Sequence, residues 1–118
     1  KDTVRIAWDW AVRSFGIEHV NNGPIRALRI AEEAVELCQT YEIDKETMIL
    51  LINQVYARPP GDAFQEMGGV LMTAYVMCAA KWGDPDKVFL SELRRVLDKP
   101  SEHFAQRNQD KIDMGLKA

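Results

Sequence analysis

Apolar residues recur every three or four positions along most of the chain, which is the spacing of one face of an α-helix. The first run of this kind consists of Val4, Ala7, Trp8, Ala11, Val12 and Phe15. It predicts an amphipathic helix that ends before the break "GIEHVNNGP" at residues 16–24. No segment alternates apolar and polar residues as a half-buried strand does. The pattern therefore predicts an all-α fold.

Caps and breaks divide the remaining chain into further helices. Pro24 suits a first helical position and opens a helix that runs to residue 41. Three more are expected at 44–57, 62–82 and 84–97, and a last helix follows Ser101 as its cap. Asp44 and Asp84 are the expected caps of their helices. We expect one domain over residues 1–118, a compact bundle of four main helices with one or two short ones.

Composition and charge narrow the function classes. The chain is 47% hydrophobic and 28% charged, as in ordinary globular domains, and its formal net charge of −3 argues against nucleic-acid binding. No apolar run reaches the length of a membrane span, and no signal-peptide pattern begins the chain. Cys38 and Cys78 suit free buried thiols in a reducing cytoplasm, and no Cys/His spacing indicates zinc.

Two helices carry their acids in narrow stripes. Arg29, Glu33 and Glu36 share one face of the segment "RALRIAEEAVELCQT". Asp62 and Glu66 share a stripe with a glycine in the later segment "DAFQEMGGVLMTAYV". If the stripes face each other, the carboxylates form a site that a cation must neutralise, and oxygen-only ligands favour Mg²⁺ or Mn²⁺. The alternative is a solvated pair on the first stripe, with Arg29 bound to Glu33 one turn away.

The second stripe is unusual for a helix that only packs. Glu66 lies among apolar neighbours, and Gly68 and Gly69 follow it directly. Each glycine costs a helix interior roughly 0.5–1 kcal/mol relative to alanine. A carboxylate in apolar surroundings is also costly unless it is paired or binds a metal. The stretch "QEMGGVL" therefore indicates a site.

These motifs resemble the MazG-like all-α nucleoside triphosphate pyrophosphohydrolases, which are related to dimeric dUTPases and phosphoribosyl-ATP pyrophosphohydrolases. That family carries E-x-x-E, a spacer and E-x-x-D on facing helices. Here "EEAVEL" supplies Glu33 and Glu36, and "QEMGGVL" supplies Glu66. The resemblance covers about residues 4–115, including "DPDKVFLSELRRV" and the tail that ends in "QDKIDMG".

The resemblance implies a metal-dependent enzyme that cleaves a nucleoside triphosphate to the monophosphate and pyrophosphate, with a role in nucleotide-pool housekeeping. Glu33, Glu36 and Glu66 would hold Mg²⁺ or Mn²⁺, and one of them, or Glu32, would act as the base. Candidate phosphate contacts are Arg29, Arg107, Asn108 and Lys111. Trp10 lies off the apolar stripe and is free to stack a base, whereas Trp8 and Phe15 are expected in the core.

One position departs from the family pattern. The final aspartate of the second acidic pair falls on Gly69, which has no ligand atom. Asp62, one turn before Glu66, is the only nearby acid that can act as a surrogate, although a helix N-cap is its plain role. The alternative function is a nucleotide-binding or oligomeric scaffold that has lost catalysis. A third class, a helical interaction module, requires an exposed apolar helix face.

The oligomeric state follows from two arguments. The resemblance implies a homodimer or a dimer of dimers. Independently, the segment 62–82 is apolar nearly all round, and a small bundle leaves part of such a helix without cover. We therefore expect association with a second copy, with no nucleic acid and no membrane among the partners.

Overall fold

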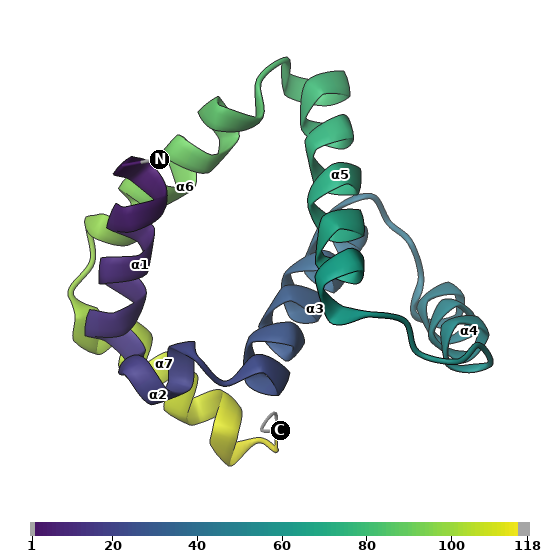
Figure 1. The fold of residues 1–118 in the computed structure, drawn as a ribbon, viewed down its shortest axis with the longest axis horizontal. Helices are drawn as coiled ribbons and strands as arrows, with labels where there is room; N and C mark the ends of the chain where they lie inside the picture. The colour runs from purple at the N-terminus through teal and green to yellow at the C-terminus, as the bar shows by residue number, and fades with distance from the viewer. Residues whose placement is uncertain (1, 116–118) are drawn as a thin grey trace.

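The computed structural model describes residues 2–115, and within them the chain forms seven helices and no strand (Figure 1). In chain order they are α1 (Asp2–Phe15), α2 (Ile17–Val20), α3 (Gly23–Thr40), α4 (Lys45–Tyr56), α5 (Ala63–Trp82), α6 (Pro85–Leu97) and α7 (Ser101–Asp113). The all-α prediction is confirmed. The short α2 lies inside the segment expected as a break, because its four residues are too few to show an apolar period.

Side-chain caps fix where several helices begin. Asp44 accepts a hydrogen bond from the backbone N–H of Thr47 at 2.9 Å and so begins α4 as expected. Asp84 begins α6 in the same way, with Pro85 in the first turn. The expectation for Ser101 is wrong, because Ser101 is itself the first residue of α7 and no side chain caps that helix.

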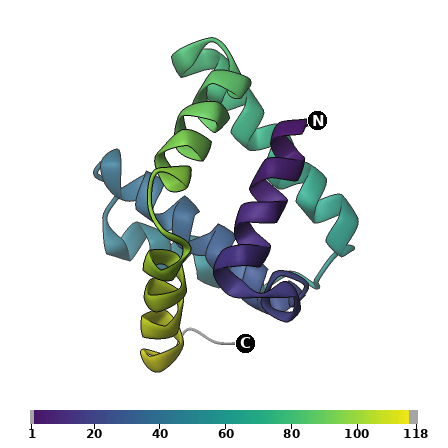
Figure 2. The same ribbon diagram turned by 90° about the vertical axis from the view of Figure 1, so that its left-hand side faces the viewer.

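The core lies where α1 packs against α6 and α7 (Figures 1 and 2). Leu93, Val96 and Phe104 form its centre, and Trp10 and Phe15 pack against them. Since aromatic residues bury the largest apolar areas, these rings supply much of the packing at this point. This group of helices is the best-packed part of the described chain.

The buried face of α1 differs from the apolar face that the sequence predicts. Ala11 and Ser14 are buried and Trp10 packs on the core, whereas Trp8 is 42% exposed. The buried face therefore keeps Ala11 and Phe15 of the predicted stripe, but it turns away from Val4 and Trp8 and toward Trp10. The expectation that Trp8 belongs to the core is wrong, because α6 and α7 approach α1 from the side that carries Trp10.

The helices α3, α4 and α5 spread away from this core (Figure 1). None of the extensive helix-to-helix contacts among residues 2–115 involves α4. The radius of gyration is 15.5 Å, larger than the roughly 13.5 Å expected for a compact chain of this length. Within the described residues, no helix combines the length and the apolar character needed to cross a bilayer. The apolar residues of α3 to α5 are thus left largely in contact with solvent.

Candidate functional site

A cavity of about 370 Å³ opens beside the core, between α1, α3, α6 and α7. Ordinary ligand pockets have volumes of about 300–1,000 Å³, so this cavity is large enough for a small ligand. Its lining comprises Trp10, Phe15, Arg26, Arg29, Ile30, Glu33, Glu92, Arg95, Val96, Phe104, Arg107, Asn108 and Lys111. The site therefore draws on helices that lie far apart in the sequence.

The lining is strongly basic although the whole chain is acidic. Five basic and two acidic side chains face the cavity, which leaves an excess of three positive charges. Arg95 belongs to none of the predicted site motifs, and its guanidinium forms a bidentate contact with Glu92 at 2.9 and 2.6 Å. Such a concentration of guanidinium and ammonium groups favours an anion, above all phosphate.

An aromatic wall faces the same cavity. The ring of Trp10 meets Phe15 at 5.5 Å and Phe104 at 5.0 Å, in both cases edge to face. Arg26 lies over the Phe15 ring at 5.7 Å. Trp10 was expected off the apolar stripe and free to stack a base, but it also packs on the core. Its indole N–H is buried and has no hydrogen-bond partner, so one polar atom beside the cavity is left unsatisfied.

Polar contacts tie α3 to α7 across the cavity. Arg29 donates a hydrogen bond from Nη2 to Oδ1 of Asn108 at 2.8 Å. Lys111 Nζ lies 2.9 Å from Oε1 of Glu32, and both side chains are about three-quarters buried, with 24% and 25% exposed. All four candidate phosphate contacts line this one cavity: Arg29, Arg107, Asn108 and Lys111.

Glu33 is the acid of the first stripe that lines this cavity. Partial burial of its carboxylate and the neighbouring charge of Glu36 raise its pKa, with smaller contributions in the same direction from Glu32 and Glu92. Lys111 opposes the shift. The raised pKa means that the charged form of Glu33 is unfavourable here, and a bound cation would relieve that cost. Glu33 and Glu36 therefore suit a shared cation.

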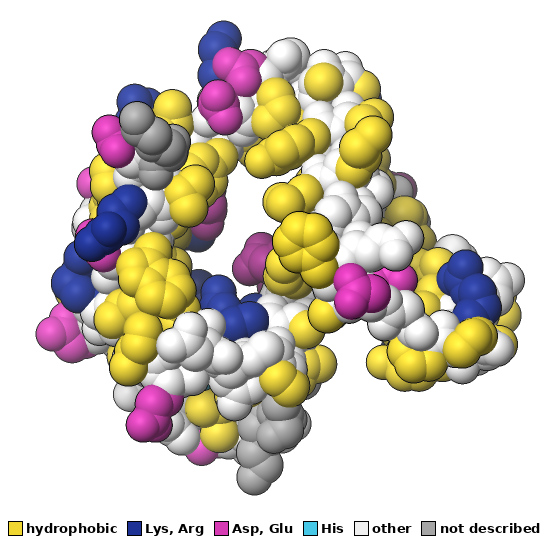
Figure 3. All heavy atoms as spheres, in the orientation of Figure 1, with side chains coloured by type: hydrophobic (Ala, Val, Ile, Leu, Met, Phe, Trp, Pro, Cys, Tyr) yellow, Lys and Arg dark blue, Asp and Glu magenta, His cyan; other side chains and the backbone are white. Residues whose placement is uncertain are grey.

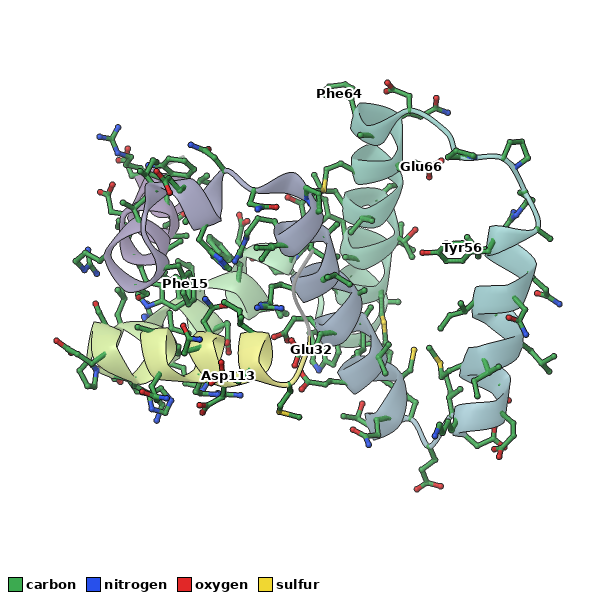
Figure 4. All side chains as sticks on the ribbon, turned by 90° about the horizontal axis from the view of Figure 1, so that it is seen from below. Phe15, Glu32, Tyr56, Phe64, Glu66 and Asp113 are labelled. Carbon is green, nitrogen blue, oxygen red and sulfur yellow. The ribbon has the colours of Figure 1, made fainter. Side chains whose placement is uncertain are left out.

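Glu66 lies elsewhere, in the first turn of α5 (Figure 4), and Asp62 is the N-cap of the same helix. Glu66 lines a second, open cavity of about 670 Å³ beside Tyr56 and the turn "RPPG". Its carboxylate covers Gly61, where a Cβ would lie 2.5 Å from Glu66 Oε2. Asp62 caps α5 by accepting from Gln65 N at 3.0 Å. The cap accounts for Asp62 without a metal.

Within a single chain, the three predicted metal ligands do not lie together at one site. Among residues 2–115, no group of three or more His, Cys, Asp or Glu side chains is arranged to hold a metal ion. Glu33 faces the first cavity, Glu66 faces the second, and Glu36 lines neither. The residues fit a metal only in part, with two neighbouring carboxylates on α3, and the three-ligand set stays a prediction.

Comparison with known proteins yields no match, whether to a protein family, to a curated protein or to a solved structure. Membership of the MazG-like group therefore rests on the motifs of the sequence and stays a prediction. Cys38 and Cys78 are free and half-buried, in agreement with unpaired thiols.

Replacing Glu33 with glutamine is expected to raise the melting temperature at neutral pH in metal-free buffer. The folded protein has a raised Glu33 pKa, so the cost of charging this group is fully present above that pKa. The cost is absent below the ordinary pKa of glutamate, and the gain should therefore disappear in acid. Melting curves of Glu33→Gln and of Glu102→Gln, an exposed α7 control, from about pH 7 to about pH 4 check this. A gain that persists in acid contradicts it.

Asp62 should behave as a helix cap. Asp62→Ala is expected to lower the free energy of unfolding by about 1 kcal/mol, and Asp62→Asn by much less, because asparagine also accepts at an N-cap. Asp44, which caps α4 through Thr47, offers the same pair of substitutions as a control. Urea unfolding at one protein concentration measures all four variants. Equal losses for Asp62→Asn and Asp62→Ala would show that the charge has another role.

Proposed function

We propose that this protein is a metal-dependent nucleoside triphosphate pyrophosphohydrolase that releases a (deoxy)nucleoside monophosphate and pyrophosphate. The observation that carries the proposal is the cavity of about 370 Å³, where an excess of positive charge, an aromatic wall and Glu33 lie together. A nucleotide has the matching parts: a polyanionic tail and a flat base. The free cysteines suit a cytoplasmic role in nucleotide-pool housekeeping.

The phosphates bind the basic side chains of α3 and α7. Arg29 is held toward the cavity by Asn108, and its guanidinium suits two phosphate oxygens at once. Lys111 contributes a point charge and exchanges part of its contact with Glu32 for the substrate. The nucleobase lies toward Trp10 and Phe15, which line another part of the cavity. The binding energy comes from both halves of the substrate.

The reaction is hydrolysis of a phosphoric anhydride. A water oxygen forms a bond to the α-phosphorus, the bond to the bridging oxygen breaks, and pyrophosphate leaves with the bonding electrons. A carboxylate accepts the proton of the water. Glu33 is the best placed of the four candidate glutamates, because it is the one that lines this cavity. Arg29 and Lys111 offset the negative charge that develops on the leaving group.

Glu33 and Glu36 would hold Mg²⁺ or Mn²⁺. Such an ion would neutralise phosphate oxygens and lower the pKa of the attacking water. The resemblance alone implies Glu66 as a third ligand, because within one chain Glu66 faces the second cavity.

A second function is favoured by the separation of Glu66 from Glu33 and by Gly69. A chain that keeps the basic cavity but lacks a complete metal site would bind nucleotides without cleaving them. It would then act as a nucleotide-binding or oligomeric scaffold. The two functions share the cavity and differ in turnover.

Activity on a panel of nucleoside triphosphates with Mg²⁺ or Mn²⁺ tests the proposal. Pyrophosphate and a monophosphate are the expected products, and Glu33→Gln, which removes the proposed base, should lower kcat by about 10²-fold or more. Arg29→Ala should raise KM by about tenfold, since it removes a charged phosphate contact. Glu102→Gln, outside the cavity, is the control. Nucleotide binding without turnover favours the scaffold, and the absence of both contradicts the two functions.

The variant Gly69→Asp distinguishes a metal site that has lost a ligand from one that is already complete. A Cβ at Gly69 would meet nothing within 4 Å, and aspartate is mildly better than glycine in a helix interior, so the variant should fold. We expect tighter Mn²⁺ binding and faster turnover, with Asp62→Asn unchanged because Asp62 acts as a cap. Calorimetry and pyrophosphate release measure both. Slower turnover in Gly69→Asp, together with loss of activity in Asp62→Asn, would instead make Asp62 the surrogate ligand.

A further inference from the structure

Basic and apolar side chains meet at the hollow between α1 and α3 (Figure 3), and the cavity there has two chemically different ends. The polar contacts between α3 and α7 begin at Arg29 and continue to Glu32, toward the C-terminal end of α3. Arg26 lies on the other side of Arg29, about 4.5 Å back along the helix axis, and its guanidinium is over the Phe15 ring. Phe15 and Glu32, which lie apart in Figure 4, mark the aromatic end and the polar end.

The guanidinium of Arg26 lines the cavity as a set of donors without a protein acceptor. Within residues 2–115 the structure shows no hydrogen bond and no ion pair of this side chain, whereas Arg95 is paired with Glu92. Partial burial and the nearby charge of Arg29 lower the pKa of the Arg26 guanidinium, which is still charged at neutral pH. A partly buried charged donor without an acceptor is unfavourable. A ligand that presents acceptors would relieve that cost.

The acids of the lining lie away from Arg26. Glu92 is held by the bidentate contact with Arg95. Glu33 follows Arg26 by seven residues on α3, which is about 10 Å along the axis. No acid of the described chain contributes to the pKa shift of Arg26, and the rings of the aromatic wall have no acceptor atom. The aromatic end therefore offers donors and no side-chain acceptor.

The edges of the nucleobases differ in what they present to such donors. Guanine carries two adjacent acceptors, N7 and O6, and the fork of an arginine donates to both at once. Adenine carries N7 beside an amino group, which is itself a donor and faces a guanidinium unfavourably. Cytosine presents an amino group, and thymine presents a single acceptor beside its methyl group. The donor pattern of the aromatic end thus matches a 6-oxopurine best.

We propose that Arg26 determines the base specificity of this cavity, and that the preferred substrate carries a 6-oxopurine base, guanine above all. The inference rests on the proposed nucleotide-binding function and names its substrate class. The guanidinium donates to N7 and O6 of the base, while the phosphates extend along α3 toward Arg29 and Lys111. Because Arg26 already lies over Phe15, its fork is ordered before the base arrives, which reduces the entropy lost on binding.

Calorimetry with the α,β-methylene triphosphates of guanosine and adenosine tests the specificity in the presence of Mg²⁺. Carbon replaces the bridging oxygen in these analogues, so that binding is measured without turnover. The native protein should bind the guanosine analogue at least about fivefold more tightly, as a bidentate base contact provides. Arg26→Gln should remove this preference, because a glutamine amide matches N7 and the amino group of adenine. Arg94→Gln, an exposed α6 position outside the lining, should keep it.

Competition by two monophosphates tests the same contact without any substitution in the protein. Guanosine monophosphate and its 7-deaza derivative displace the bound guanosine analogue, and the derivative carries C–H in place of N7. Loss of one hydrogen bond to a charged donor should weaken the derivative about tenfold. This measurement applies even if Arg26→Gln fails to fold. Equal displacement by the two monophosphates would overturn the contact.

The outcomes separate the specificity from the enzymatic activity. Equal affinities of the native protein for the two analogues, or equal losses of both in Arg26→Gln, would overturn the specificity and leave the proposed function standing. A guanosine preference that depends on Arg26, in a protein that does not cleave GTP, would support the specificity and contradict the pyrophosphohydrolase. Binding of neither analogue would contradict both.

Discussion

The packing of α1 against α6 and α7 is the constraint on which the rest of the structure depends. Phe104, Leu93 and Val96 are the buried centre, and few other side chains in the described residues are as well covered. This contact fixes the positions of three helices that each contribute to the basic cavity. Without it, the aromatic wall and the basic residues of α7 would have no fixed relation to α3.

The helix α3 contributes to the cavity and also exposes apolar residues. One side carries Arg29 and Glu33 and meets α7 through polar contacts. Other residues of the same helix, such as Val35 and Leu37, are more than 40% exposed. The position of α3 therefore depends on its polar contacts with α7 more than on apolar packing.

Much of the fold and part of the candidate site could be predicted from the sequence. Helical periodicity and caps such as Asp44 depend on neighbouring residues, and these local rules placed most helices. Arg29 and Glu33 share one helical stripe, so their proximity was also predictable. Their meeting with Asn108 and Lys111 was not predictable from local rules, because α7 follows α3 by more than 60 residues and only packing brings the two together.

The sequence by itself determined an all-helical chain, the positions of its turns and the acidic stripes. Only the tertiary structure decided which side of α1 is buried, so that Trp10 rather than Trp8 reaches the core. It also decided that Glu33 and Glu66 face different cavities. The physical reason is that periodicity fixes which residues share a face of one helix. The partner of that face depends on how the helices pack, which short-range patterns do not encode.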